Sequence, residues 1–118
     1  MKYLLIVFFF PTYLLAQSKQ ISIIPVPVSL LQNVGEFIIN EQTQIEFSAQ
    51  SKQLQSAASF LRNAIQDISG LNLPINKYAK QKIVLALIKD AVIGEEGYHL
   101  TVSINAIQIK ANTPAGII

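Results

Sequence analysis

Few residues in this chain have the type and spacing that catalysis needs. Glu95 and Glu96 are the only adjacent carboxylates, but acid–base catalysis needs two carboxyl groups held apart across a substrate. Because the pair stands between Gly94 and Gly97, a solvated turn is the favoured interpretation. His99 is the only histidine and cysteine is absent, so a transition-metal site would have too few ligands.

Motifs for nucleophilic catalysis and phosphate binding are not found in the sequence either. Serines occur throughout, but none stands in a Gly-x-Ser-x-Gly elbow, and no glycine-rich loop precedes Lys-Ser or Lys-Thr. Tyr98 could stack on a sugar, but its alternation with Leu100 and Val102 favours core packing, and His99 is then expected at the surface. We therefore predict no catalytic, cofactor-binding or metal-binding residue in this chain.

Composition indicates a single folded domain that does not bind nucleic acid. The chain has 118 residues, 51% of them hydrophobic, which a disordered chain would not show. Its nine basic residues are scattered and are diluted by seven acidic ones, so no basic patch is expected. The absence of cysteine excludes disulfides but does not argue against export.

The N-terminus has the pattern of a secretory signal peptide, predicted over residues 1–18. Residues 3–15 are almost unbroken apolar sequence, shorter than the roughly 20 residues that a membrane-spanning helix needs. Cleavage after Ser18 is preferred to cleavage after Ala16, and an uncleaved anchor is the alternative. Gln17 occupies the position of the lipidated cysteine of a lipoprotein. We expect an exported protein, periplasmic or extracellular, with no lipid and no stable membrane anchor.

Short extended segments are expected in the first half of the mature chain. Residues 21–28 are apolar and β-branched but carry Pro25 and Pro27, which cannot donate to a ladder, so this segment belongs at a sheet edge or in an extended lead-in. Residues 36–39 and 44–47 are separated by a turn and are predicted to pair as a hairpin.

One long helix is predicted over residues 48–69. Ser51 or Ser48 can cap its start, and Gly70 is placed to end it in a left-handed conformation. Its apolar stripe is expected to lie on the sheet and consists of Leu54, Ala57, Ala58, Leu61, Ala64, Ile65 and Ile68.

The second half of the chain supplies the remaining strands. Residues 82–89 contain six consecutive apolar positions between two lysines, which indicates an interior strand. Residues 98–102 and 107–111 alternate with period two and are predicted to form a hairpin. Thr113 then suits an N-cap and Pro114 the first helical position. The chain is expected to be cut before this second helix is complete.

These elements predict an α+β domain over residues 19–118. Its sheet is mixed or mainly antiparallel, one long helix (about residues 50–69) packs on one face, and a second helix begins at the C-terminus.

Three short strings resemble the N-terminal domain of bacterial glycoside hydrolase family 20, the β-N-acetylhexosaminidases. They are IPVP with GEF at residues 24–27 and 35–37, EGYHLTV at 96–102, and IQIKANTPAG at 107–116. Their order and spacing carry the resemblance across residues 21–118.

The resemblance implies an exported enzyme that removes terminal N-acetylglucosamine or N-acetylgalactosamine from glycans. It also implies that a (β/α)8 barrel, absent from this chain, does the catalysis with an aspartate–glutamate pair and the substrate's own acetamido group. No catalytic residue transfers to these residues, which would support the barrel and form no site of their own. The alternatives are the leading domain of a related glycosidase, such as an α-glucuronidase or another N-acetylglucosaminidase, and a free-standing exported binding module.

Overall fold

The chain divides into two compact units, residues 1–32 and 33–118. The computed structural model describes residues 21–23, 26–47, 51–75 and 78–118. In the first unit the described residues form no helix or strand and are mostly exposed. The predicted signal peptide, with cleavage sites at Ala16 and Ser18, lies outside the described residues. All elements discussed below belong to the second unit.

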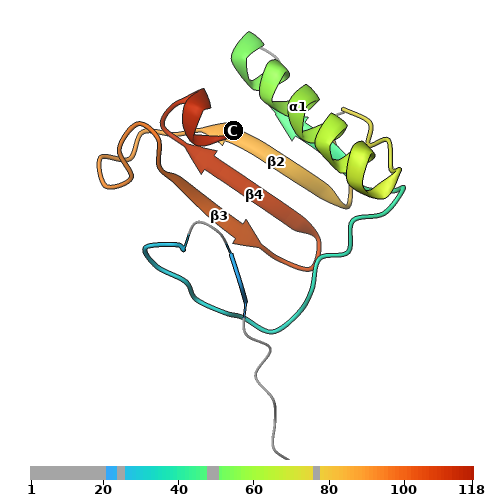
Figure 1. The fold of residues 1–118 in the computed structure, drawn as a ribbon, viewed down its shortest axis with the longest axis horizontal. Helices are drawn as coiled ribbons and strands as arrows, with labels where there is room; N and C mark the ends of the chain where they lie inside the picture. Colours follow the sequence, from blue (N-terminus) through green and yellow to red (C-terminus); the bar gives the residue numbers. More distant parts are fainter. Residues whose placement is uncertain (1–20, 24–25, 48–50, 76–77) are drawn as a thin grey trace, which may run out of the picture. The chain divides into compact units, whose positions relative to one another are not determined.

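The second unit contains a mixed four-stranded sheet with the order β1–β2–β4–β3 (Figure 1). The strands are β1 (Gln44–Phe47), β2 (Lys82–Leu87), β3 (Tyr98–Val102) and β4 (Ala106–Ala111). β2 runs parallel to both β1 and β4, whereas β3 and β4 are antiparallel. With α1 (Lys52–Ser69) on one face of this sheet, the predicted α+β fold class is confirmed.

β2 lies inside the sheet, as its apolar run predicts. Ile83 and Leu85 are buried and face α1, since alternate side chains of a strand point to the same face. Val84 and Ala86 are half-buried on the opposite face. The chain passes from β1 through α1 to the parallel β2, which is the connection that parallel neighbours require.

The predicted hairpin between residues 36–39 and 44–47 is wrong. β1 forms over residues 44–47, but 36–39 form no strand. One side of β1 pairs with β2. On the other side, the N–H of Ile45 donates to the carbonyl of Pro74 at 2.9 Å, and Ile45 bridges to Ile75. Because both sides of β1 are occupied, no place is left for the hairpin partner.

Both caps of α1 follow the sequence prediction. Ser51 is the N-cap, and its hydroxyl accepts a hydrogen bond from the N–H of Leu54 at 3.2 Å. Gly70 ends the helix with φ 75°, and its N–H donates to the carbonyl of Gln66 at 2.8 Å. These caps satisfy backbone groups at both ends and set the bounds of α1.

The core lies between α1 and the sheet. Its buried members are Ile45, Leu54, Ala57, Ala58, Leu73, Ile83 and Leu85. Leu61 and Ile65 of α1 pack against them. Ile68 does not: it is 89% exposed, which corrects the prediction that it lies on the sheet. Eighteen helical residues span about 27 Å, whereas strands of four to six residues span roughly 13–20 Å, so the last turn extends past the sheet.

The C-terminal hairpin forms as predicted. β3 and β4 are joined by a tight turn in which Ser103 donates its N–H to the carbonyl of Ala106 at 2.8 Å. The Ser103 hydroxyl also accepts from the N–H of Ala106 at 3.1 Å. A 3-10 turn, η1 (Pro114–Gly116), follows β4 at the predicted helix start. Among the described residues, no helix is long and apolar enough to cross a membrane.

Candidate functional site

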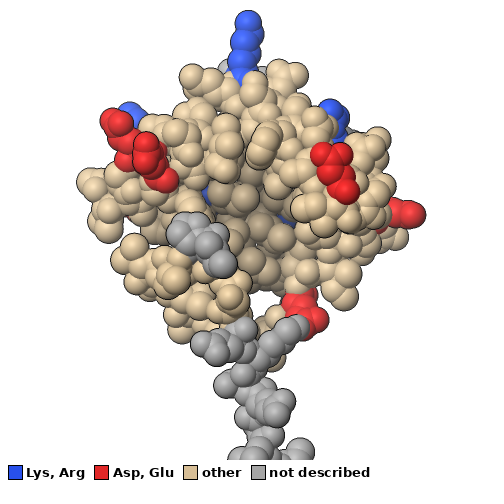
Figure 2. Space-filling view, in the orientation of Figure 1, with Lys and Arg blue, Asp and Glu red and all other residues tan. Residues whose placement is uncertain are grey.

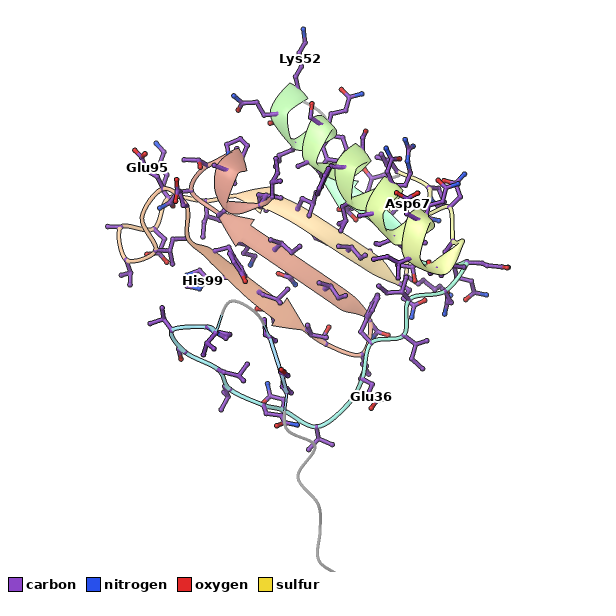
Figure 3. The ribbon with its side chains drawn as sticks, viewed as in Figure 1. Glu36, Lys52, Asp67, Glu95 and His99 are labelled. Atoms are coloured by element: carbon purple, nitrogen blue, oxygen red, sulfur yellow. The ribbon has the colours of Figure 1, made fainter. Side chains whose placement is uncertain are left out.

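The most developed polar cluster lies where the loop before β3 meets the end of β4. Asp90, just after β2, places Oδ2 2.9 Å from Nε2 of His99 on β3. Its other carboxylate oxygen accepts from the N–H of Val92 at 2.9 Å. Both side chains are partly exposed, and Figure 3 shows His99 on β3 beside this loop. The surface position predicted for His99 is confirmed.

Asn112 ties this loop to the strand that precedes η1. Its Oδ1 accepts from the N–H of Asp90 at 2.7 Å, and its Nδ2 donates to the carbonyls of Asp90 and Gly94, each at 2.6 Å. The amide side chain therefore satisfies backbone groups in the way that a neighbouring strand would. Sequence reasoning missed both Asp90 and Asn112, because the partners stand 22 residues apart.

η1 is held against the same loop by a close backbone approach. Gly116 is buried. A β-carbon at this position would lie 2.6 Å from the carbonyl oxygen of Gly97 and 2.8 Å from the β-carbon of Ala111. Only glycine fits this contact, because both neighbours are attached directly to backbone. The chain after β4 is therefore fixed in position before it leaves the sheet.

Thr113 occupies the predicted N-cap position, with an extended backbone at φ −133° and ψ 162°. The predicted role of its hydroxyl is wrong, however. It makes no capping hydrogen bond to η1 and instead donates to the carbonyl of Glu95 at 2.6 Å. Pro114 stands at the start of the turn, as expected. Thr113 thus adds a further tie between the loop and the end of β4.

Glu95 and Glu96 lie in the turn before β3, where both are exposed. In Figure 3 the side chain of Glu95 points outward from this loop, away from the sheet. This is the solvated turn that the flanking glycines predict. Within the described residues no group of three or more acidic or histidine side chains could hold a metal ion.

Lys82 and Glu46 form a separate ion pair on the sheet face opposite α1. Lys82 Nζ lies 3.0 Å from Glu46 Oε2, and both side chains are partly exposed. A pair of this kind contributes about 0–1 kcal/mol and offers no acid–base chemistry while both groups are engaged. It joins β1 to β2 at their surface.

The predicted core position of Tyr98 is wrong. Tyr98 is 45% exposed, and Leu100 and Val102 are 46% and 50% exposed. These three residues pair with Ala111, Ile109 and Ile107 of β4 and share their face of the sheet, because antiparallel partners point the same way. α1 packs on β1 and β2, so it does not extend over β3 at the far edge.

We name this exposed surface the apolar strip; its residues are Phe60, Tyr98, Leu100, Val102, Ile117 and Ile118. Between α1 and the C-terminus lies a hollow of about 70 Å³ whose floor includes Leu85 and Ile109. In Figure 2 most of the visible charged atoms lie toward the outline of this face and few lie in its middle. An exposed non-polar surface thus lies on the α1 side of the sheet.

The Asp90–His99 pair gives a pH-dependent prediction. The hydrogen bond from His99, followed by that from the Val92 N–H, holds the pKa of Asp90 below its ordinary value of 3.8. A carboxyl group whose pKa is lower in the folded state than in the unfolded state stabilises the fold at pH values above the unfolded-state pKa. This contribution is lost as the pH falls through the folded-state pKa. We expect an NMR titration of the Asp90 carboxyl carbon to have its midpoint below 3.8.

Replacing His99 tests the cause of that shift. In His99→Ala the Asp90 midpoint should rise toward its ordinary value, whereas Thr101→Ala, on the same strand and face, should leave it unchanged. An Asp90 midpoint that is the same with and without His99 would show that the pair does not control this carboxyl group.

The geometry of these residues is that of a structural clasp. The side chains of Asp90, Asn112 and Thr113 are engaged in holding one loop against one strand end.

Comparison with known proteins identifies the domain. The family model described as "Glycosyl hydrolase family 20, domain 2" matches residues 20–118. The chain belongs to glycoside hydrolase family 20. The resemblance inferred from the three sequence strings is thereby confirmed, and the match is to the non-catalytic N-terminal domain of that family.

Solved structures of family 20 enzymes share the fold of this domain. The β-N-acetylhexosaminidase of Streptomyces coelicolor A3(2) has a TM-score of 0.70 at 24% identity, and the match covers 77% of this chain and 18% of that chain. The exo-β-N-acetylglucosaminidase of Vibrio harveyi has a TM-score of 0.58 at 24% identity, covering 72% and 13%. The chitobiase of Flavobacterium johnsoniae has a TM-score of 0.54 at 20% identity, covering 73% and 15%.

The family 20 domain therefore spans less than a fifth of the length of these solved relatives. No curated protein matches the sequence significantly.

Proposed function

We propose that this family 20 domain is the leading, non-catalytic part of an exported β-N-acetylhexosaminidase that removes terminal N-acetylglucosamine or N-acetylgalactosamine from glycans. The observation that carries the proposal is the family match over residues 20–118. The small share of each solved relative that the domain covers supports it, since the rest of those chains has room for a catalytic domain.

In this proposal the catalytic groups belong to a (β/α)8 barrel in the same polypeptide, and the domain's partner is that barrel. The glycan substrate meets the barrel. The clasp formed by Asp90, Asn112 and Thr113 supports this assignment, because it holds the direction of the chain rigidly as it leaves β4. A rigid exit keeps two packed domains in one relative orientation.

Export is part of the same proposal. The positively charged start and the short apolar run of residues 3–15 support a signal peptide that ends at Ser18. The mature enzyme would then act in the periplasm or outside the cell, where glycan polymers are found. Mass spectrometry of the mature protein tests this, since cleavage after Ser18 leaves Lys19 as the first residue; an intact Met1 would contradict it.

The experiment that tests the activity is a panel of chromogenic glycosides offered to the protein encoded by the complete reading frame. We expect hydrolysis of the N-acetyl-β-glucosaminide and the N-acetyl-β-galactosaminide, and none of the α-glucuronide. The unsubstituted β-glucoside is the matched control, because it lacks the acetamido group that assists the reaction in this family. Hydrolysis of the α-glucuronide alone would assign the domain to a related glycosidase. Inactivity on the whole panel would favour a binding module.

A further inference from the structure

A second hollow lies at the end of the sheet where β1 and β2 finish. Its volume is about 380 Å³, within the range of roughly 300–1,000 Å³ that small-molecule sites have. Glu46, Val84 and Ala86 line it, and they share the sheet face opposite α1 because they alternate with the strand residues of the core. Tyr78, from the connection between α1 and β2, also lines it. We name this site the Tyr78 hollow.

Tyr78 presents its ring to solvent at this hollow. The residue is 90% exposed, so most of its aromatic surface is available for contact. Its backbone is left-handed, with φ 75°, and among the described residues it is the only one other than glycine with a positive φ. A β-carbon disfavours that conformation, and strained backbones of this kind cluster at ligand sites. An aromatic side chain held open in this way suits contact with a ligand.

Glu46 gives the Tyr78 hollow a charged group. Its Oε2 lies 3.0 Å from Nζ of Lys82, and both side chains are partly exposed. A carboxylate accepts hydrogen bonds and an ammonium group donates them, so the pair offers both roles to a ligand. Val84 and Ala86 are half-buried and add apolar surface beside the carboxylate. The hollow therefore combines an aromatic ring, an apolar floor and a polar pair.

This combination of groups matches a 2-acetamido sugar. A pyranose ring has a C–H face that packs on an aromatic side chain, and hydroxyl groups that both donate and accept hydrogen bonds. Its acetamido group adds an N–H for the carboxylate of Glu46 and a methyl group for the apolar floor. Phosphate-bearing ligands are disfavoured, because the same carboxylate repels an anion.

We propose that the Tyr78 hollow binds a 2-acetamido sugar unit of a glycan, with the ring of Tyr78 stacked on the sugar and Glu46 accepting a hydrogen bond from the acetamido N–H. This inference rests on the proposed function, which brings glycans that contain N-acetylhexosamines to the protein. The site gives the family 20 domain a role in holding the glycan, in addition to the support of a barrel.

Adsorption to an insoluble polymer measures this binding. The protein encoded by the complete reading frame is mixed in the cold with chitin, a polymer of β-linked N-acetylglucosamine, and the unbound protein is measured over a range of polymer amounts. Cellulose is the matched polymer, because it has the same linkage with a hydroxyl group in place of each acetamido group. We expect chitin to retain the protein about tenfold more strongly than cellulose, as the loss of one hydrogen bond to a charged group predicts.

Tyr78→Ala should weaken adsorption to chitin about tenfold, whereas Tyr78→Phe keeps the ring and should retain most of it. Because Tyr78 is 90% exposed, the midpoint of thermal unfolding should be the same in both variants and in the unmodified protein. Thr101→Ala is the matched control, since it lies on the same sheet face but outside the hollow. It should adsorb like the unmodified protein.

Equal adsorption of the unmodified protein and Tyr78→Ala would overturn the proposal. Equal adsorption to chitin and cellulose, or adsorption to neither polymer, would also overturn it. A dimer in sedimentation velocity that dissociates in Tyr78→Ala would assign the surface to a second copy of the chain instead.

Hydrolysis of a chromogenic N-acetyl-β-glucosaminide by the unmodified protein separates this inference from the proposed function. An active protein whose adsorption to chitin does not depend on Tyr78 refutes the sugar site and leaves the function standing. An inactive protein that adsorbs to chitin through Tyr78 refutes the function and leaves the sugar site standing.

Discussion

Leu85→Ala is expected to lower the free energy of unfolding by about 2–5 kcal/mol, the usual cost of removing a large side chain from a packed core. Leu85 is 1% exposed and lies on β2, an interior strand that pairs with β1 and β4. Side chains of α1 pack against Leu85 in the core, so the neighbouring side chains cannot easily fill the cavity that the alanine substitution leaves. Urea titration followed by circular dichroism measures the change.

Leu87→Ala is the matched control for that variant. It makes the same substitution on the same strand and the same face two residues later, but Leu87 is 39% exposed. The free energy of unfolding should fall by less than about 1.5 kcal/mol in this variant, because much of the Leu87 side chain is already in contact with water. Equal losses at the two positions would mean that the core between α1 and the sheet is not the principal source of stability.

Gly116→Ala is expected to cost about 1–3 kcal/mol, in the range found for overpacked sites. The new β-carbon would meet the carbonyl oxygen of Gly97 at 2.6 Å and the β-carbon of Ala111 at 2.8 Å. Neither neighbour can rotate away, so η1 or the loop before β3 must move. Besides the lower midpoint of thermal unfolding, we expect changed NMR shifts at Asn112 and Thr113, whose side chains hold that loop.

Gly70→Ala distinguishes crowding from backbone strain. Gly70 has φ 75°, but a β-carbon there would meet nothing within 4 Å. Gly70→Ala should lower the free energy of unfolding by about 1–2 kcal/mol, the strain of a left-handed backbone alone. The NMR shifts of Asn112 and Thr113 should not change. If Gly116→Ala left the NMR shifts of the loop unaltered, the close approach at η1 would not be what positions the end of β4.

The local parts of this fold are predictable from sequence because their causes lie within a few residues. Ser51 and Gly70 bound α1 through contacts three and four residues away. The continuous apolar run of β2 predicts an interior strand, because such a run has apolar side chains on both faces of the sheet. The hairpin of β3 and β4 follows from alternation and a short turn whose hydrogen bonds stay between Ser103 and Ala106.

Most of what the sequence did not predict depends on contacts made by distant residues. The partner of β1 is decided by Pro74 and Ile75, about 30 residues along the chain. The alternation of apolar and polar residues along β3 predicts that Tyr98 and His99 lie on opposite faces of the sheet. It does not predict that α1 leaves β3 uncovered. The clasp joins Asp90 to Asn112 through side-chain hydrogen bonds that no local spacing signals.

The non-catalytic role of this domain is tested by hydrolysis of a chromogenic N-acetyl-β-glucosaminide by two purified proteins, residues 19–118 and the protein encoded by the same gene's complete reading frame. We expect turnover by the longer protein and none above the uncatalysed rate by the shorter one, since we assign catalysis to a barrel outside the family 20 domain. Turnover by residues 19–118 would contradict the non-catalytic role, because the chemistry would then lie among residues that have only structural roles here.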